Sequence, residues 1–145
     1  MSVELPFAPV DTIIRRNAGS LRVSAEAAEE LARRIQERGA ELAARAAEVA
    51  TTDGRKTLMA SDFDVEVTAD KDDLELPIAP VDRIARLEID DYRVSMDARI
   101  ALASLLESYA DRVAAAAADL ARHADRRTVK AEDVEAYFRL AAYYE

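Results

Sequence analysis

Two long amphipathic segments dominate the hydrophobic pattern of the chain, one in each half. In both, apolar residues recur every three or four positions, which is typical of a helix with one buried face. Each pattern predicts a helix of about 26–28 residues, roughly 40 Å long at 1.5 Å per residue. Such a helix, in a half of about 70 residues, needs a partner of similar length to cover its apolar face. The apolar positions are Ala28, Leu31, Ile35, Leu42, Ala46 and Val49 in the first half, and Leu102, Leu105, Leu106, Tyr109, Val113, Ala117 and Leu120 in the second.

A shorter helix is expected before each long one. Pro9 and Pro80 stand where these helices should begin, and Asp11 and Asp82 follow in a turn that suits an acid at a positive helix end. The two helices are expected to end near residues 16 and 88.

Serine residues and β-branched residues predict the remaining helix boundaries. Ser24 and Ser95 are predicted N-caps of the long helices, because each precedes an acidic first turn. A further helix is predicted at Ala131–Tyr143. Its counterpart in the first half is expected to be short, because the sequence Val65–Thr68 contains three β-branched residues.

The sequence repeats itself at an offset of 71 residues. Of the 60 aligned positions from 4 to 63, 24 are identical without a gap, and they include the motifs ELPxAPVD, RVS and RxT. Alanine matches on helices could be compositional, but three such motifs at one offset indicate an internal duplication. The predicted domains are residues 1–67 and 75–145, joined by an acidic linker at 68–74.

Composition excludes several kinds of chemistry. The chain has no cysteine and one histidine, His123, so disulfides and thiolate catalysis are excluded, and a histidine-based metal site or catalytic triad is not expected. We expect no enzyme, cofactor or metal. The longest apolar run, Val113–Ala118, is far shorter than the roughly 20 residues that span a bilayer, and no signal segment is evident. A cytoplasmic protein is expected.

The charge of the chain is unevenly distributed. The formal net charge is -9, and the 20 basic residues include only three lysines. An acidic, lysine-poor surface resembles the proteins of salt-loving microbes. Positive charge nevertheless gathers at residues 122–130, with a weaker echo at residues 55–56.

The order of elements and motifs resembles the histone fold. The segments ELPIAPVDRI, RVS and LARHADRRTVKAED resemble archaeal histones, and the resemblance covers residues 4–65 and 75–142. It implies an all-α protein of two histone folds, each with a short, a long and a short helix, fused in tandem. The two folds would form an intramolecular handshake pseudo-dimer, in which the first loop of one copy lies beside the second loop of the other.

The resemblance implies double-stranded DNA as the partner. Arg22 and Arg93 match the family arginine that enters the minor groove without reading sequence. The N-termini of the two first helices would face phosphate between the loops. Further expected DNA-binding residues are Arg15, Arg55, Lys56 and Thr57 in the first copy, and Arg83, Arg86, Arg126, Arg127, Thr128 and Lys130 in the second.

Two of these arginines have a second possible role. Arg55 and Asp62 are seven residues apart, as are Arg126 and Asp133. In the family the equivalent pair forms a salt bridge that braces the second loop. For Arg55 and Arg126, loop bracing and DNA contact both remain open.

A family interface between dimers is matched in one copy only. Leu120, His123 and Asp133 match residues of a four-helix bundle, whereas the first copy has Thr52 at the histidine position. We therefore expect two chains to associate through their second copies and form a closed pair.

The expected function is a DNA-binding, nucleoid-associated histone that bends or wraps DNA without strong sequence specificity and organises chromatin. Binding by counterion release weakens steeply with salt, so an acidic chain in a saline cytoplasm could have weak general affinity. A transcription regulator at selected sites and a protein-interaction module are the alternatives.

Overall fold

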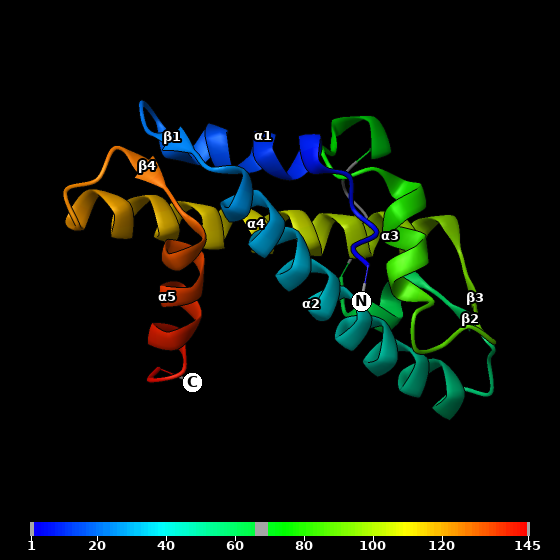
Figure 1. Cartoon of the computed structure of the whole chain (residues 1–145). Coiled ribbons are helices and arrows are strands. Elements are labelled where there is room, and N and C mark those ends of the chain that lie inside the picture. The colour runs from blue at the N-terminus through cyan, green and yellow to red at the C-terminus, as the bar shows by residue number, and fades with distance from the viewer. Residues whose placement is uncertain (1, 66–69, 145) are drawn as a thin grey trace.

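The computed structural model describes residues 2–65 and 70–144 (Figure 1). The expectation of an all-α fold is confirmed, since the described part is helical apart from turns and four two-residue strands. Within these residues the structure contains no helix that could span a lipid bilayer. The helices are α1 (Phe7–Ala18), α2 (Ala25–Thr52), α3 (Ile78–Ala85), α4 (Met96–His123) and α5 (Ala131–Ala141). The strands are β1 (Arg22–Val23), β2 (Thr57–Leu58), β3 (Arg93–Val94) and β4 (Thr128–Val129).

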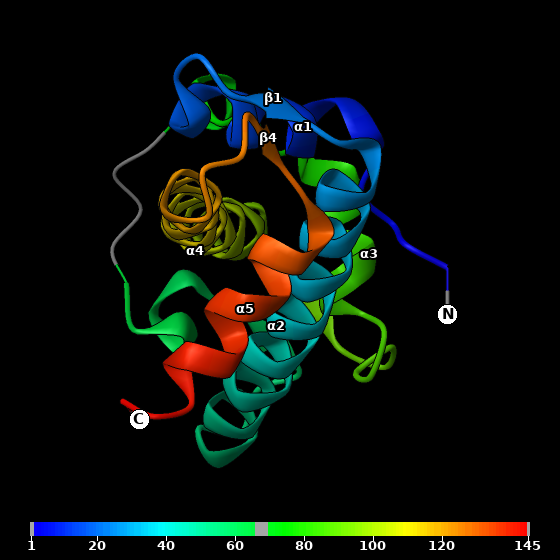
Figure 2. The same ribbon diagram turned by 60° about the vertical axis from the view of Figure 1, so that its left-hand side comes forward.

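The two long helices have the predicted length and the predicted caps. Helices α2 and α4 have 28 residues each. The hydroxyl of Ser24 accepts the N–H of Ala27 at 3.1 Å, and the hydroxyl of Ser95 accepts the N–H of Ala98 at 3.1 Å. Helix α2 crosses α4 obliquely (Figure 1), and Figure 2 shows α1 and α5 on opposite sides of α4.

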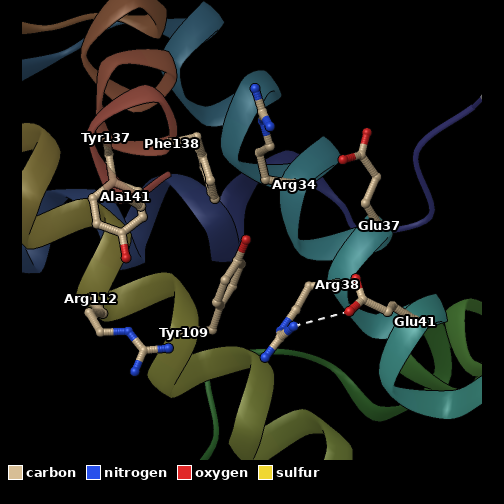
Figure 3. Close-up of a pocket in the computed structure, with 9 residues that line it drawn as sticks. All are labelled: Arg34, Glu37, Arg38, Glu41, Tyr109, Arg112, Tyr137, Phe138 and Ala141. Carbon is tan, nitrogen blue, oxygen red and sulfur yellow. Dashed lines mark hydrogen bonds and ion pairs between the residues drawn. The ribbon is translucent and has the colours of Figure 1, made fainter. Parts of the chain in front are cut away.

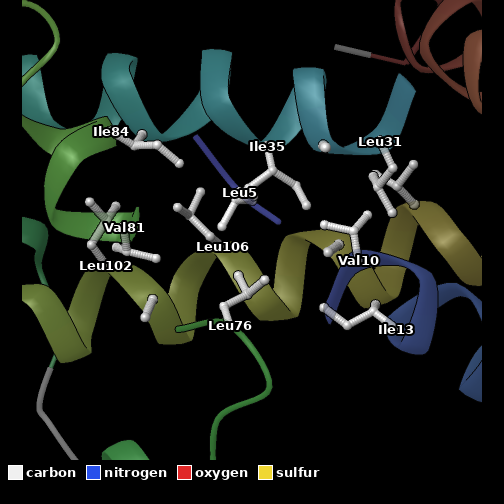
Figure 4. Close-up of a cluster of buried hydrophobic side chains, with 14 of the residues drawn as sticks. Leu5, Val10, Ile13, Leu31, Ile35, Leu76, Val81, Ile84, Leu102 and Leu106 are labelled. Carbon is white, nitrogen blue, oxygen red and sulfur yellow. The ribbon is translucent and has the colours of Figure 1, made fainter. Parts of the chain in front are cut away.

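Both copies contribute to one hydrophobic core (Figure 4). Helix α2 approaches the second copy closely at Gly39, where a Cβ would lie 2.6 Å from Ile84 Cγ2 and 3.0 Å from Leu106 Cδ1. Val49 was expected in this core but is 46% exposed. The last turns of α2 bury alanines at positions 43, 46, 47 and 50 instead, and Val49 lies on the flank of that face.

A buried polar residue in each long helix holds the segment before a short helix. Gln36 accepts the N–H of Glu4 at 2.7 Å, and Glu107, at the matching position, accepts the N–H groups of Glu75 at 2.7 Å and Leu76 at 3.0 Å. The carboxylate of Glu107 also receives Arg16 Nη2 from the first copy at 3.1 Å. The negative charge of Glu107 in the second copy is therefore balanced by Arg16 of the first copy.

The first short helices begin earlier than predicted. Helices α1 and α3 start two residues ahead of Pro9 and Pro80, because Pro6 and Pro77, with φ of -67° and -73°, already precede the first turn. Pro9 and Pro80 take the third helical position, where a backbone N–H would have no intrahelical acceptor. The predicted end of the second of these helices, near residue 88, is also wrong, since α3 ends at Ala85.

Asp11 and Asp82 consequently lie in the second helical turn, so the expectation of an acid in the first turn is wrong. They pair along the helix instead. Arg15 Nε lies 2.7 Å from Asp11 Oδ2, and Arg86 Nε lies 3.1 Å from Asp82 Oδ2.

The third helix of the first copy is short, as predicted. It is a 3-10 turn at Ala60–Phe63, whereas α5 in the second copy has 11 residues. A second 3-10 turn spans Lys71–Asp73 in the expected linker. Residues 66–69 lie outside the described part of the chain, so the linker at 68–74 and the domain boundaries stay predictions.

Candidate nucleic-acid interface

Loops of opposite copies lie side by side at two places, as the handshake arrangement predicts. Strand β1 pairs in parallel with β4, which sets Arg22 opposite Thr128, and β2 pairs with β3, which sets Thr57 opposite Arg93. The two places lie at opposite ends of the molecule (Figure 1). We call residues 18–24 with 122–133 the first loop pair, and residues 89–95 with 51–62 the second loop pair.

Backbone hydrogen bonds fix the register of each loop pair. The N–H of Arg22 donates to the carbonyl of Arg127 at 2.8 Å, and the N–H of Arg93 donates to the carbonyl of Lys56 at 2.9 Å. The expected neighbourhoods of Arg22 and Arg93 are therefore confirmed. Residues about 105 positions apart for one pair, and about 37 for the other, meet because α2 and α4 run past each other.

The two long helices end in the same backbone motif, which aims the second loops. Gly54 and Asp125, at matching positions, have left-handed φ of 74° and 61°. The N–H groups of Arg55 and Arg126 donate back to the carbonyls of residues 50 and 121 at 2.8 and 3.0 Å. This is a Schellman turn, which satisfies carbonyls at the helix end.

The loop-bracing salt bridges are present in both copies. Arg55 donates to both Asp62 oxygens at 2.8 and 2.9 Å and to the carbonyl of Thr57 at 2.9 Å. Arg126 likewise donates to both oxygens of Asp133 and to the carbonyl of Thr128 at 3.2 Å. The hydrogen bond from Arg55, opposed by burial, holds the pKa of Asp62 below its ordinary value.

The bracing role of these arginines is thus supported by geometry, since their guanidinium groups are largely used within the loop. The hydroxyls of Thr57 and Thr128 form no hydrogen bond with any described residue. Both hydroxyls stay candidate hydrogen-bond donors to DNA phosphate.

Four of the predicted DNA-contact residues have no acidic partner among the described residues. Arg22, Arg93, Arg127 and Lys130 are exposed, and none of them forms an ion pair within the described chain. Arg22 and Arg127 line a cavity of about 520 Å³ at the first loop pair. These four residues have the exposure and charge that a phosphate contact requires.

Lys56 differs from the other predicted contacts. Its Nζ lies 3.1 Å from Asp91 Oδ2 and 4.5 Å from the ring centroid of Tyr92. The hydrogen bond to Asp91 raises the pKa of Lys56 and lowers that of the aspartate. A phosphate would have to compete with this carboxylate.

The arginines of the first short helices are all paired. Arg83 Nε lies 2.9 Å from Glu4 Oε1, and the α1 N-terminus lies beside α3 (Figure 1). Arg86 Nη1 donates to the carbonyl of Tyr92 at 2.9 Å, so it braces the loop between α3 and β3. Arg15 is tied to its own helix by Asp11. DNA contact by Arg15, Arg83 and Arg86 stays a prediction, with the bracing role of Arg86 the better supported.

The predicted oligomer residues lie at one end of the second copy. His123 is exposed in the last turn of α4, Leu120 is half-buried one turn earlier, and Asp133 is buried in α5. Both carboxylate oxygens of Asp133 are engaged by Arg126, and one of them also accepts the N–H of Lys130 at 2.8 Å. The carboxylate thus acts within its own chain, whatever further contact it makes.

A hollow of about 550 Å³ between α2, α4 and α5 was not foreseen from the sequence (Figure 3). Tyr109 and Phe138 face each other with ring centroids 6.2 Å apart, and burial raises the pKa of the Tyr109 phenol. The guanidinium of Arg34 lies 4.3 Å from the Phe138 centroid, and that of Arg38 lies 5.8 Å from the Tyr109 centroid. No loop-pair residue lines it, so it is separate from the candidate DNA surface.

The interlock of Arg16 with Glu107 was also missed. Its signal was present in the offset alignment, where Arg16 matches Leu87 and Gln36 matches Glu107. A positive charge found only in the first copy and a negative charge found only in the second indicate contact between these two positions.

Comparisons with known proteins assign both halves of the chain to one family. The chain matches the family described as "Histone-like transcription factor (CBF/NF-Y) and archaeal histone" twice, over residues 3–65 and 74–136. It is 58% identical over 60 residues to a polypeptide of the archaeal histone HAN1 from Thermococcus zilligii, which covers 41% of this chain and 88% of that protein. It is 46% identical over 65 residues to "Probable archaeal histone 3" of Methanocaldococcus jannaschii, which covers 45% of this chain and 96% of that protein.

A solved structure shares the whole architecture. The crystal structure of the histone from Methanopyrus kandleri superposes with a TM-score of 0.70 at 28% identity, over 90% of this chain and 91% of that one. Coverage that high means that the relative arrangement of both halves is matched.

Proposed function

Because the chain belongs to the family of histone-like transcription factors and archaeal histones, with two histone folds in tandem, we propose that it binds double-stranded DNA and compacts it. The expected architecture of two packed histone folds is confirmed. Proteins of this family are not enzymes, as the sequence predicted for this chain.

The observation that carries the proposal is the pairing of loops between the copies. It brings an exposed arginine, Arg22 or Arg93, beside basic side chains of the opposite copy at each end of one molecule. Arg22 and Arg93 enter the minor groove and, with Lys56, Arg127 and Lys130, hold phosphates nearby. Contacts at two ends of one rigid body bend the duplex between them, without strong sequence specificity.

The N-termini of α1 and α3 form a third contact between the loop pairs. Neither helix has a side-chain cap, because prolines precede both. Their first N–H groups therefore remain available to phosphate oxygens. The chain acts in the nucleoid.

Two chains associate through their second copies. Leu120 and His123 lie at the exposed end of α4, and the matching position in the first copy carries Thr52. One copy offers the interface and the other does not, so association closes at two chains. Crosslinked species larger than two chains on DNA would contradict this.

The composition supports a haloarchaeal type of histone that works at high salt. The chain has 29 acidic residues and three lysines, and several arginines are held in ion pairs on its surface. A regulator at selected sites, or a protein-interaction module, remains the alternative function. Genome-wide occupancy separates packaging, which gives broad coverage, from regulation, which gives sparse peaks.

The central experiment is binding to a duplex of about 60 base pairs, titrated from low salt to molar KCl. The variants are wild type, Arg22→Ala/Arg93→Ala, and a control, Arg33→Ala/Arg45→Ala. The control removes two exposed arginines of α2 that are ion-paired to glutamates. We expect the loop variant to lose most of the affinity and the control to keep it. Absence of binding by the folded wild type at every salt concentration would refute DNA binding and leave the interaction-module alternative.

A further inference from the structure

The two loop pairs carry unequal charge. At matching positions of the repeat, the first loop pair has five basic and three acidic residues, whereas the second has three basic and four acidic residues. The first loop pair is therefore net positive and the second net negative. A duplex that touches both ends meets a different field at each.

The difference centres on one pair of matching positions. Asp91 in the second loop pair matches Ser20 in the first, and Lys56 matches Arg127. Asp91 Oδ2 lies 3.1 Å from Lys56 Nζ, so the carboxylate stands where a phosphate oxygen would approach. At the first loop pair the residue in that place carries no charge.

The first loop pair instead leaves an open basic hollow. Ser20, Leu21, Arg22 and Arg127 line the cavity of about 520 Å³, and within the described chain neither arginine is ion-paired. The hollow has room for a phosphate group, and both cations that line it are available to one.

We propose that the first loop pair is the stronger DNA phosphate site of the molecule, and that Asp91 weakens the second loop pair by holding Lys56. This inference rests on the proposed DNA-binding function and refines it. The ion pair is exposed, with 69% and 65% of the Lys56 and Asp91 side chains accessible, so phosphate can displace the carboxylate. The displaced aspartate, with Asp90 beside it, then repels the phosphate.

The complex with DNA consequently has a direction. As salt rises, the second loop pair releases the duplex before the first does, because its net charge opposes binding. The DNA would open from one end of the molecule rather than from both.

A reciprocal exchange of the two matching residues tests this inference. Asp91→Ser gives the second loop pair the residue of the first, and Ser20→Asp does the reverse. Both variants of the full chain are titrated against the duplex of about 60 base pairs across a KCl series. We expect Asp91→Ser to bind about threefold to tenfold more tightly, with the slope of log affinity against log salt steeper by about 0.9, the value of one added phosphate contact. Ser20→Asp is expected to weaken binding by a similar factor.

Two controls assign the effect to the lysine rather than to net charge. Lys56→Ala added to Asp91→Ser should abolish the gain. Glu135→Gln removes one acid from α5, where Glu135 forms no ion pair with any described residue, and should leave affinity within about twofold of wild type. Circular dichroism establishes whether each variant is folded. If Asp91→Ser does not fold, Ser20→Asp still tests the inference.

The outcomes separate the two proposals. Wild-type binding with unchanged affinity in both exchange variants would overturn the unequal-ends inference and leave DNA binding standing. An equal gain in Glu135→Gln would also overturn it, because general charge would then explain the effect. Absence of wild-type binding at every salt concentration would instead overturn the proposed function itself.

Discussion

Replacing Arg16 with leucine tests whether ion pairs between the two copies stabilise the fold. Arg16 Nη2 lies 3.1 Å from Glu107 Oε2 and 2.7 Å from Asp111 Oδ2. Burial acts to raise the pKa of Asp111, but hydrogen bonds from Arg16 and Asn17 outweigh it and hold that pKa below its ordinary value. The variant copies the second half, which has Leu87 at this position.

The size of the effect follows from the exposure of the partners. A hydrogen bond to a charged group contributes about 1.5–3 kcal/mol, and a solvent-exposed ion pair contributes about 0–1 kcal/mol. The Glu107 side chain is 12% exposed and that of Arg16 is 39% exposed, so the pair is expected near the lower end of the first range. We expect Arg16→Leu to lower the free energy of unfolding by about 1.5–2 kcal/mol.

Glu107→Gln supplies the second arm of a double-mutant cycle. The amide oxygen keeps an acceptor for the two backbone N–H groups, just as the amide oxygen of Gln36 accepts the N–H of Glu4 in the first copy, so its cost is expected to be about 1 kcal/mol. The double variant should lose less than the sum of the single variants, with a coupling of about 1 kcal/mol.

Urea unfolding followed by circular dichroism measures all four proteins. The exposed pair Arg33–Glu37 on α2, with side chains 48% and 55% accessible, is the control cycle, and its coupling should stay below about 0.5 kcal/mol. A coupling below about 0.3 kcal/mol between Arg16 and Glu107 would refute the reasoning, because the two residues would then be energetically independent.

Three further predictions concern stability. Gly39→Ala should lower the melting temperature and cost about 1–3 kcal/mol, despite the better helix propensity of alanine, because its Cβ would collide with Ile84 of the other copy; an unchanged melting temperature would contradict this. Asp62→Asn should flatten the acid limb of stability against pH: the folded-state pKa of Asp62 is lowered by Arg55, so its contribution is full above its unfolded pKa of about 3.9 and is lost as pH falls through the folded value. Urea midpoints from pH 7 to pH 2 measure this, and parallel curves for both proteins would refute it. Asp125→Gly should raise the free energy of unfolding by about 0.5 kcal/mol, since its φ of 61° is the glycine-favouring value that Gly54 has at the matching position; any loss in thermal unfolding would contradict this.

Much of the fold could be predicted because the duplication doubled each signal. The long helices follow from apolar spacing and their caps from serines that occur twice at one offset, whereas the pairing of loops was implied by the resemblance to the histone fold. The positions of Pro9 and Pro80 misled the prediction of helix starts, because proline is tolerated anywhere in the first turn and Pro6 and Pro77 give the same signal three residues earlier. Val49 was misplaced because a periodic pattern does not show where small residues replace large ones in the core.

The candidate site could be predicted in outline but not in its charge state. The sequence placed basic residues at both loop pairs, and the pairing of strands confirmed their neighbourhoods. The sequence did not predict that Asp91 forms an ion pair with Lys56 or that Arg86 donates to the carbonyl of Tyr92. These contacts depend on side-chain directions across loops, which neither periodicity nor composition encodes. The hollow beside Tyr109 depends likewise on where α5 lands against α2.

The way the halves interleave also sets an order of events during synthesis. The apolar face of α2 is covered by α4, and β1 finds its hydrogen-bond partner only in β4, near the end of the chain. Ribosomes add about 5–20 residues per second, so the finished α2 waits roughly 4–14 s for residue 123 to be made. During that interval the nascent first half lacks the helix that covers the apolar face of α2 in the finished fold. Ribosome-bound chains that expose only the first half should therefore be cut readily by protease, and resistance should rise once β4 emerges.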